Sequence, residues 1–141
     1  MGLETDIFSP LDLAGFEIHS DYFPGRNLEN RYNVVARWWG AENRDELVLM
    51  AHEDTVEVGD VEKWDFNLLS GEVKDGKIFG RGACDDKYAI ALFIIKLLKE
   101  QSFVPKTNLL LAAYSDEEHG GSHGAMAAAG RICKNNCSIY T

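Results

Sequence analysis

The sequence predicts an α/β fold with a mixed, largely parallel sheet flanked by helices. Three apolar runs have the composition of strands, at residues 32–39, 46–51 and 107–114. Between the second and third runs, apolar side chains recur at helical spacing over residues 85–101. A strand–helix–strand order is typical of a right-handed parallel crossover. With 141 residues and 45% apolar residues, the chain has enough material for one packed domain.

The N-terminal third should supply short elements and then two strands. Leu11–Ala14 fits the end of a helix, and the alternation in Phe16–His19 predicts a strand. The short connection between the strands at 32–39 and 46–51 predicts an antiparallel hairpin. Because the run at 46–51 is almost continuously apolar, we expect that strand to be buried on both faces.

The second half should supply the crossover. Asp75-Gly76 predicts a turn before a short strand at Lys77–Phe79, which we expect to join the sheet. The helix at 85–101 should bury the stripe formed by Ile90, Phe93, Ile94, Leu97 and Leu98. After the strand at 107–114, Ala125–Ala129 fits the start of a second helix.

Charge and composition exclude several classes of protein. A formal net charge of −9 argues against nucleic acid or an anionic membrane as a partner. The acidic first residues, Met1–Asp6, lack the apolar core of a secretory signal, and the most apolar run, Ala89–Leu98, is too short to span a bilayer. Three cysteines form no disulfide framework. We therefore expect a cytoplasmic protein with reduced thiols.

Three clusters of acidic or histidine residues each follow a strand-like run. They are His52-Glu53-Asp54, Asp85-Asp86 and Asp116-Glu117-Glu118. If the strands are neighbours in one sheet, their carboxyl ends meet at one crevice. One imidazole with several carboxylates suits zinc, cobalt or manganese. Each cluster taken alone has an ordinary alternative, because Asp85 and Asp86 also suit the start of a helix and the other acids suit a solvated loop.

The spacing within the clusters indicates roles in hydrolysis. Residues two apart on a strand point the same way, so Asp54 is placed to accept the ring N–H of His52. Asp85 is the natural bridge if two ions are bound, because one carboxylate spans paired ions. Glu117 and Glu118 would point opposite ways on an extended segment. One of them is then a ligand and the other a general base.

Several further motifs accompany the three clusters. In order, the elements are His52-Glu53-Asp54, Trp64 with Phe66, the glycine-arginine block Asp75-Gly76-Lys77-Ile78-Phe79-Gly80-Arg81-Gly82-Ala83-Cys84-Asp85-Asp86-Lys87, and Asp116-Glu117-Glu118 with Gly120-Gly121. Together they resemble a zinc metallopeptidase and aminoacylase family that includes carboxypeptidase G, acetylornithine deacetylase, succinyl-diaminopimelate desuccinylase and aminoacylase. The glycine-arginine block is the most specific part of the resemblance.

The resemblance implies a role for each of five residues. His52 and Glu118 would each bind one of two zinc ions, with cobalt or manganese as substitutes, and Asp85 would bridge them. Asp54 would orient His52, and Glu117 would be the general base. The implied reaction is hydrolysis of an amide bond, in a short peptide or a small N-acyl amino acid, by metal-activated water. The implied fold is the catalytic domain of a zinc-dependent exopeptidase, of the phosphorylase/hydrolase-like type.

The chain also departs from the family. The resemblance covers about residues 16–130 and leaves 131–141 as an unassigned tail. Members are longer, form homodimers through an inserted lid domain, and take one more acidic and one more histidine ligand from sequence beyond the Glu-Glu pair. We therefore expect a truncated member, 1–141 being part of a catalytic domain, with weak activity. The alternative is an inactive remnant that binds only a metal or a partner. A co-catalytic zinc aminopeptidase fits the glycine-arginine block poorly.

Overall fold

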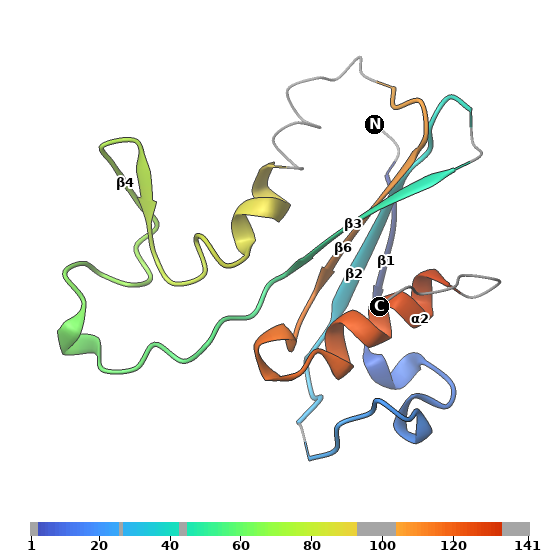
Figure 1. Ribbon diagram of the computed structural model, residues 1–141, viewed down its shortest axis with the longest axis horizontal. Helices are drawn as coiled ribbons and strands as arrows, with labels where there is room; N and C mark the ends of the chain where they lie inside the picture. The colour runs from blue at the N-terminus through green and yellow to red at the C-terminus, as the bar shows by residue number, and fades with distance from the viewer. Residues whose placement is uncertain (1–2, 26, 43–44, 93–103, 134–141) are drawn as a thin grey trace.

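A four-stranded mixed sheet forms the centre of the protein in the computed structural model, which describes residues 3–25, 27–42, 45–92 and 104–133 (Figure 1). Its strands lie in the order β1-β2-β6-β3. Their bounds are Glu4–Phe8 for β1, Asn33–Trp38 for β2, Glu46–His52 for β3 and Asn108–Tyr114 for β6. β2 pairs antiparallel with β1 and with β6, and only the β3–β6 pairing in this sheet is parallel. The predicted mixed sheet is confirmed, whereas its largely parallel character is wrong for the described strands.

The predicted hairpin between β2 and β3 is also wrong, because β6 lies between them. The connection after β2 passes over the start of β6 instead of turning back beside β2. The backbone N–H of Ala41 donates to the carbonyl oxygen of Pro105 at 2.8 Å. Gly40 lies so close to Thr107 that a Cβ at this position would overlap the Thr107 carbonyl. These contacts hold the connection after β2 against the start of β6.

β3 lies at the edge of the sheet, with β6 as its partner among the described strands. Its first five residues are exposed, Leu47 at 50% and Met50 at 40%, so the predicted burial on both faces is wrong. Only the last two residues of the strand, Ala51 and His52, are buried. The buried end of β3 is therefore the end that carries the predicted metal ligand.

A second, two-stranded sheet is built by the middle of the chain. It pairs β4 (Glu72–Lys74) with β5 (Lys77–Phe79) around a turn at Asp75-Gly76, which confirms the predicted turn. The hairpin lies away from the main sheet (Figure 1), so the expectation that residues 77–79 join that sheet is wrong. Phe66 packs edge-on against Phe79 with 5.1 Å between ring centroids, which gives the hairpin an aromatic anchor of its own.

The two predicted helices are present in part. Residues 87–92 are helical, two residues after the predicted start, and 93–101 lie outside the described residues. Residues Ser122–Met126 form a π-helical turn that leads into α2 (Ala127–Ile132), so the second helix continues past the predicted Ala125–Ala129. Ala127 and Ala128 are fully buried, and α2 packs against β2. In the described part of the chain, no helix has the length and apolar character needed to cross a bilayer.

The N-terminal segment covers the sheet with two short 3-10 helices, Pro10–Asp12 and Phe16–Ile18. The predicted strand at 16–19 is therefore wrong. The alternation there has another cause, because Phe16 enters the core at 5% exposure while Ile18 is 89% exposed on the outside of a single helical turn. The core cluster consists of Phe8, Phe16, Leu28, Val35, Leu110, Ala112, Ala127 and Ala128.

Candidate metal centre

Three of the predicted site residues meet at the carboxyl end of β3. His52 ends that strand, Asp85 lies in the turn before the helix at 87–92, and Glu118 lies in the 3-10 helix η4 (Glu117–His119). One ligand atom from each residue lies within 4.8 Å of the other two, and His52 Nε2 is 2.9 Å from an Asp85 carboxylate oxygen. One imidazole nitrogen and two carboxylate oxygens are donors that zinc, cobalt and manganese accept. The donor set and its spacing therefore fit a divalent metal ion.

His52 is held by acceptors on both ring nitrogens. Nδ1 lies 3.2 Å from the carbonyl oxygen of Asp54 and 3.4 Å from its carboxylate, and Nε2 faces Asp85. A proton on Nδ1 would be shared with Asp54 and would leave the Nε2 lone pair directed at the cluster, the tautomer that a metal ligand needs. The predicted position of Asp54 beside the imidazole is thus what the structure shows.

The carboxylates around His52 also set its charge. Burial by itself would lower the pKa of this histidine. The hydrogen bond that protonated His52 donates to Asp85 and the negative charges of Asp54, Glu117 and Asp85 outweigh burial and raise the pKa. The carboxylates that face His52 therefore favour the protonated form of the imidazole, and an ion at Nε2 would compete with that proton.

Metal affinity should consequently rise with pH. The ion competes with the proton on Nε2, and the raised pKa of His52 shifts that competition to higher pH. We expect cobalt to bind more tightly at pH 8 than at pH 6, because the protonated fraction is lost as the pH rises through the raised pKa. Cobalt titrations at pH 6, 7 and 8 measure this, and the dependence should flatten in His52→Gln. Equal affinity at pH 6 and pH 8 would contradict the assignment.

Asp54 does more than contact the histidine. Its two carboxylate oxygens accept the backbone N–H groups of Glu117 and Glu118, each at 3.2 Å. One carboxylate thus connects the end of β3 to the turn after β6. This link holds Glu118 near His52, and it was not predicted from the spacing of the motifs.

Glu117 and Glu118 do not lie on an extended segment, so the predicted geometry of this pair is wrong. Asp116 has a left-handed backbone, with φ at 66°, and this turns the chain into η4 as soon as β6 ends. Glu118 is consequently part of the cluster, and Glu117 Oε2 lies 4.0 Å from His52 Nε2. Both carboxylates lie on the cluster side of the turn.

Other residues near the cluster were not singled out by the motifs. Lys87 donates from Nζ to the carbonyl oxygen of Asp54 at 3.2 Å. The one feature of the sequence that could have indicated this role is the position of Lys87 at the end of the glycine-arginine block. His123 lies in the core and pairs with Asp116 instead of entering the cluster. His119 Nδ1 is 3.9 Å from an Asp54 carboxylate oxygen. Cys84 is exposed.

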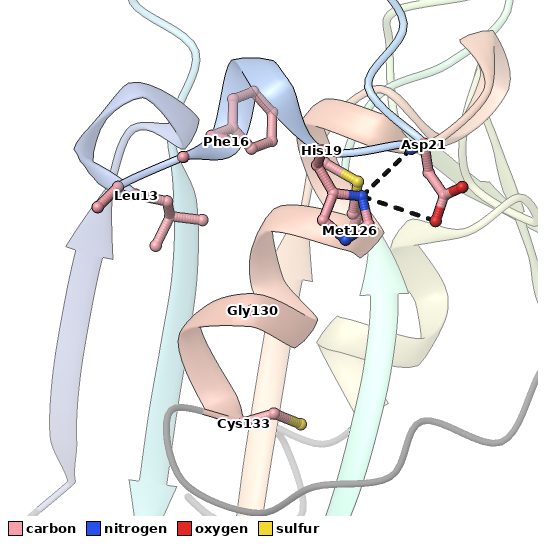
Figure 2. A pocket seen from close by; sticks show the side chains of 9 residues that line it. Leu13, Phe16, His19, Asp21, Met126, Gly130 and Cys133 are labelled. Carbon is pink, nitrogen blue, oxygen red and sulfur yellow. Dashed lines mark hydrogen bonds and ion pairs between the residues drawn. The ribbon is translucent and has the colours of Figure 1, made fainter.

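A separate hollow of about 500 Å³ lies between the N-terminal 3-10 helices and α2 (Figure 2). Its lining is mainly apolar, including Leu13, Phe16 and Met126. The polar groups at its rim are partnered, because His19 Nδ1 accepts the backbone N–H of Asp21 at 3.2 Å (Figure 2). No residue of the metal cluster lines this hollow. The hollow is therefore separate from the candidate metal centre.

Comparison with protein families gives a match over most of the chain. The model described as "Peptidase family M20/M25/M40" matches residues 48–139. The matched range contains all three ligand candidates of the cluster and both acids of the Glu117-Glu118 pair. It also contains residues 131–139, for which the motifs predict no resemblance.

Individual relatives are 35–41% identical to the chain over the residues that align. An uncharacterized metallohydrolase of Methanocaldococcus jannaschii is 36% identical over 121 residues, which cover 74% of this chain and 29% of the relative. The succinyl-diaminopimelate desuccinylase of Methylocella silvestris is 41% identical over 65% of the chain and 23% of its own length. The enzyme of the same name from Paracoccus denitrificans is 35% identical, with 83% and 30% covered. The chain thus spans less than a third of the length of these relatives.

Proposed function

The chain belongs to peptidase family M20/M25/M40. We propose that it acts as a metal-dependent hydrolase that cleaves an amide bond in a short peptide or an N-acyl amino acid. The observation that carries this proposal is the convergence of His52, Asp85 and Glu118 within 4.8 Å. The three acidic or histidine clusters come from distant parts of the chain, and this proximity of one potential ligand from each supports the proposal.

In this proposal, His52, Asp85 and Glu118 would hold the metal, with His52 as a ligand of one ion, Glu118 as a ligand of a second ion and Asp85 shared between them. Zinc is the ion that we propose, with cobalt or manganese as substitutes, because the donors are one imidazole and two carboxylates. When bound, the metal would supply an acidified water and polarise the carbonyl of the scissile amide. Asp54 would keep the proton of His52 on Nδ1, so that Nε2 remains available to the ion.

Glu117 is the proposed general base. Its carboxylate lies 4.0 Å from His52 Nε2, beside the proposed ligands, and it is half-exposed, so water can reach it. A carboxylate in this position can take a proton from the attacking water and pass it to the leaving nitrogen. The names of the desuccinylase relatives support an N-acyl amino acid with a carboxylate in the acyl group as the substrate class.

A metal titration of the 141-residue chain tests this function. We expect measurable but weak cobalt or zinc binding, with a dissociation constant above about 1 μM, because three ligand residues are few for two ions. Glu118→Gln and Asp85→Asn should weaken binding by roughly 10–100-fold, since each removes a charged donor. The matched control is Asp86→Asn, which removes the neighbouring carboxylate outside the cluster and should leave the affinity unchanged.

Two results would correct parts of the proposal. The ligand assignment is wrong if Asp86→Asn weakens binding as much as Asp85→Asn does. Binding at or below about 1 μM together with measurable amidase activity would support the proposed function and would contradict the expectation that three ligand residues bind the ions weakly.

A further inference from the structure

A buried pair of side chains joins the two ends of the turn that carries Glu117 and Glu118. Asp116 begins the turn and His123 follows it, and an Asp116 carboxylate oxygen lies 2.8 Å from His123 Nδ1. Both side chains are at most 3% exposed. The same carboxylate oxygen accepts the backbone N–H of His123 at 3.4 Å, and the carbonyl oxygen of Asp116 accepts the N–H of Gly121 at 2.7 Å. The two ends of the turn are thus joined by both side chain and backbone.

This pair is fixed to the core of the protein. The fully buried amide of Asn33 donates to the carbonyl oxygen of His123 at 2.9 Å and accepts the N–H of Ser115 at 3.0 Å. The imidazole of His123 also packs against Phe16 and Tyr22, with ring centroids 5.7 and 5.6 Å away. The base of the turn therefore has a single position relative to β2 and β6.

The opposite side of the turn faces the metal cluster. There, Asp54 accepts the N–H groups of Glu117 and Glu118, and the Glu118 side chain contributes one of the three ligand atoms. The route from His123 to the cluster is short and consists of described contacts. It runs through Asp116 to the backbone of the two glutamates and on to Asp54 and His52.

We infer that Asp116 and His123 form a positioning pair that holds Glu118 and Glu117 in register with His52. This inference rests on the proposed function, because it assigns those glutamates to the metal and to the base. His123 is not itself a ligand here, because its Nδ1 is committed to Asp116 and the ring is buried among aromatic side chains. Its Nε2 has no hydrogen-bond partner among the described residues.

The chemistry of the pair explains why its loss would reach the site. A buried carboxylate that loses its hydrogen-bond donor is strongly destabilised. The protein can reduce this cost by opening locally, so that water hydrates the carboxylate. Asp116 is the residue directly before Glu117, so an opening at Asp116 moves the backbone of both glutamates. Their amides would then leave Asp54, and the ligand atom of Glu118 would leave the cluster.

Two conservative substitutions separate positioning from simple stability. The side-chain amide nitrogen of asparagine falls where Nδ1 of histidine lies, so His123→Asn keeps the donor to Asp116. The amide nitrogen of glutamine falls where Nε2 lies, so His123→Gln keeps polarity and size but loses that donor. Val35→Ala is the stability control, because it truncates a core residue of β2 outside the turn.

The readouts are cobalt affinity, measured from the absorption bands of bound cobalt, and amide hydrogen exchange of the metal-free chain. In His123→Gln we expect about tenfold weaker cobalt binding and faster exchange confined to residues 116–121. His123→Asn should match the unsubstituted chain in both respects. Val35→Ala should lower the urea midpoint without changing cobalt affinity or the exchange of the turn.

The outcomes distinguish this inference from the proposed function. Normal exchange at 116–121 and normal cobalt affinity in His123→Gln would overturn the positioning role. A loss in His123→Asn as large as that in His123→Gln would also overturn it, since the donor to Asp116 would then not matter. If the unsubstituted chain binds no cobalt at all, the proposed function fails, and the exchange comparison still decides whether the pair holds the turn.

Discussion

Replacing Glu117 with glutamine is expected to lower any amide hydrolysis by the metal-loaded chain about 10²–10⁴-fold. Glutamine keeps the size and polarity of the side chain but cannot accept the proton that a base must take from water. Since the Glu117 carboxylate lies beside His52 and is not one of the three clustered ligands, metal affinity should remain within about threefold of the original value. The measurements are hydrolysis of an N-succinyl amino acid at saturating cobalt or zinc, and the affinity for the same ion.

Glu62→Gln is the matched control, because Glu62 lies in the distant 3-10 helix at Val61–Lys63. This variant should hydrolyse the substrate at the original rate. Hydrolysis that survives in Glu117→Gln would assign the base to another residue. If the unsubstituted chain binds metal but gives no hydrolysis above background, the inactive-remnant alternative is supported.

A second large effect is expected for Gly124→Ala, which should destabilise the protein by about 4 kcal/mol or more. Gly124 lies in the π-helical turn, where a Cβ would overlap the carbonyl oxygen of Ser115 and approach the ring of Tyr114 at 2.8 Å. The clash involves backbone, so no side-chain rotation relieves it. Relief requires the turn to separate from the end of β6, which also displaces the glutamate pair. Urea unfolding monitored by circular dichroism measures the loss.

Gly130→Ala provides the comparison within the same helical segment. A methyl group on Gly130 would meet only Leu13 Cδ1, at an ordinary 3.8 Å, so the higher helix propensity of alanine should stabilise α2 by about 0.5–1 kcal/mol. Equal unfolding midpoints for the Gly124 and Gly130 variants would show that the close approach to Ser115 is not present in solution.

The convergence of His52 and Glu118 was predictable from strand direction, whereas the place of Asp85 was not, because the strand before it belongs to the separate two-stranded sheet. β3 and β6 are parallel neighbours with His52 opposite Tyr114, so the residues that follow both strands emerge at the same edge. The order of the strands was not predictable from the short connection after β2. That order depends on tertiary contacts, such as the close passage of Gly40 over Thr107, which leave no pattern in apolar spacing.

The buried contacts that hold the turn of Glu117 and Glu118 also could not be predicted from the sequence motifs. Asp116 and His123 are seven residues apart, with Gly120-Gly121 between them, and nothing in a periodic pattern links the two. The left-handed backbone of Asp116 makes Glu117 and Glu118 part of a helical turn, so the expectation of an extended pair failed. Metal-ligand spacing is thus readable from a sequence, whereas the shape of the turn that presents the ligands depends on buried partners.

The position of β6 between two strands made much earlier has a consequence for how the molecule assembles. Among the described strands, residues 46–52 pair with residues 108–114 alone, and β2, which also pairs with β1, takes its second partner from the same strand. Both pairings close long loops, which raises the contact order and slows folding. During synthesis, His52 therefore leaves the ribosome well before the strand that fixes it. The metal cluster would then form only after β6 has joined the sheet, so metal binding by the chain would report completion of the sheet.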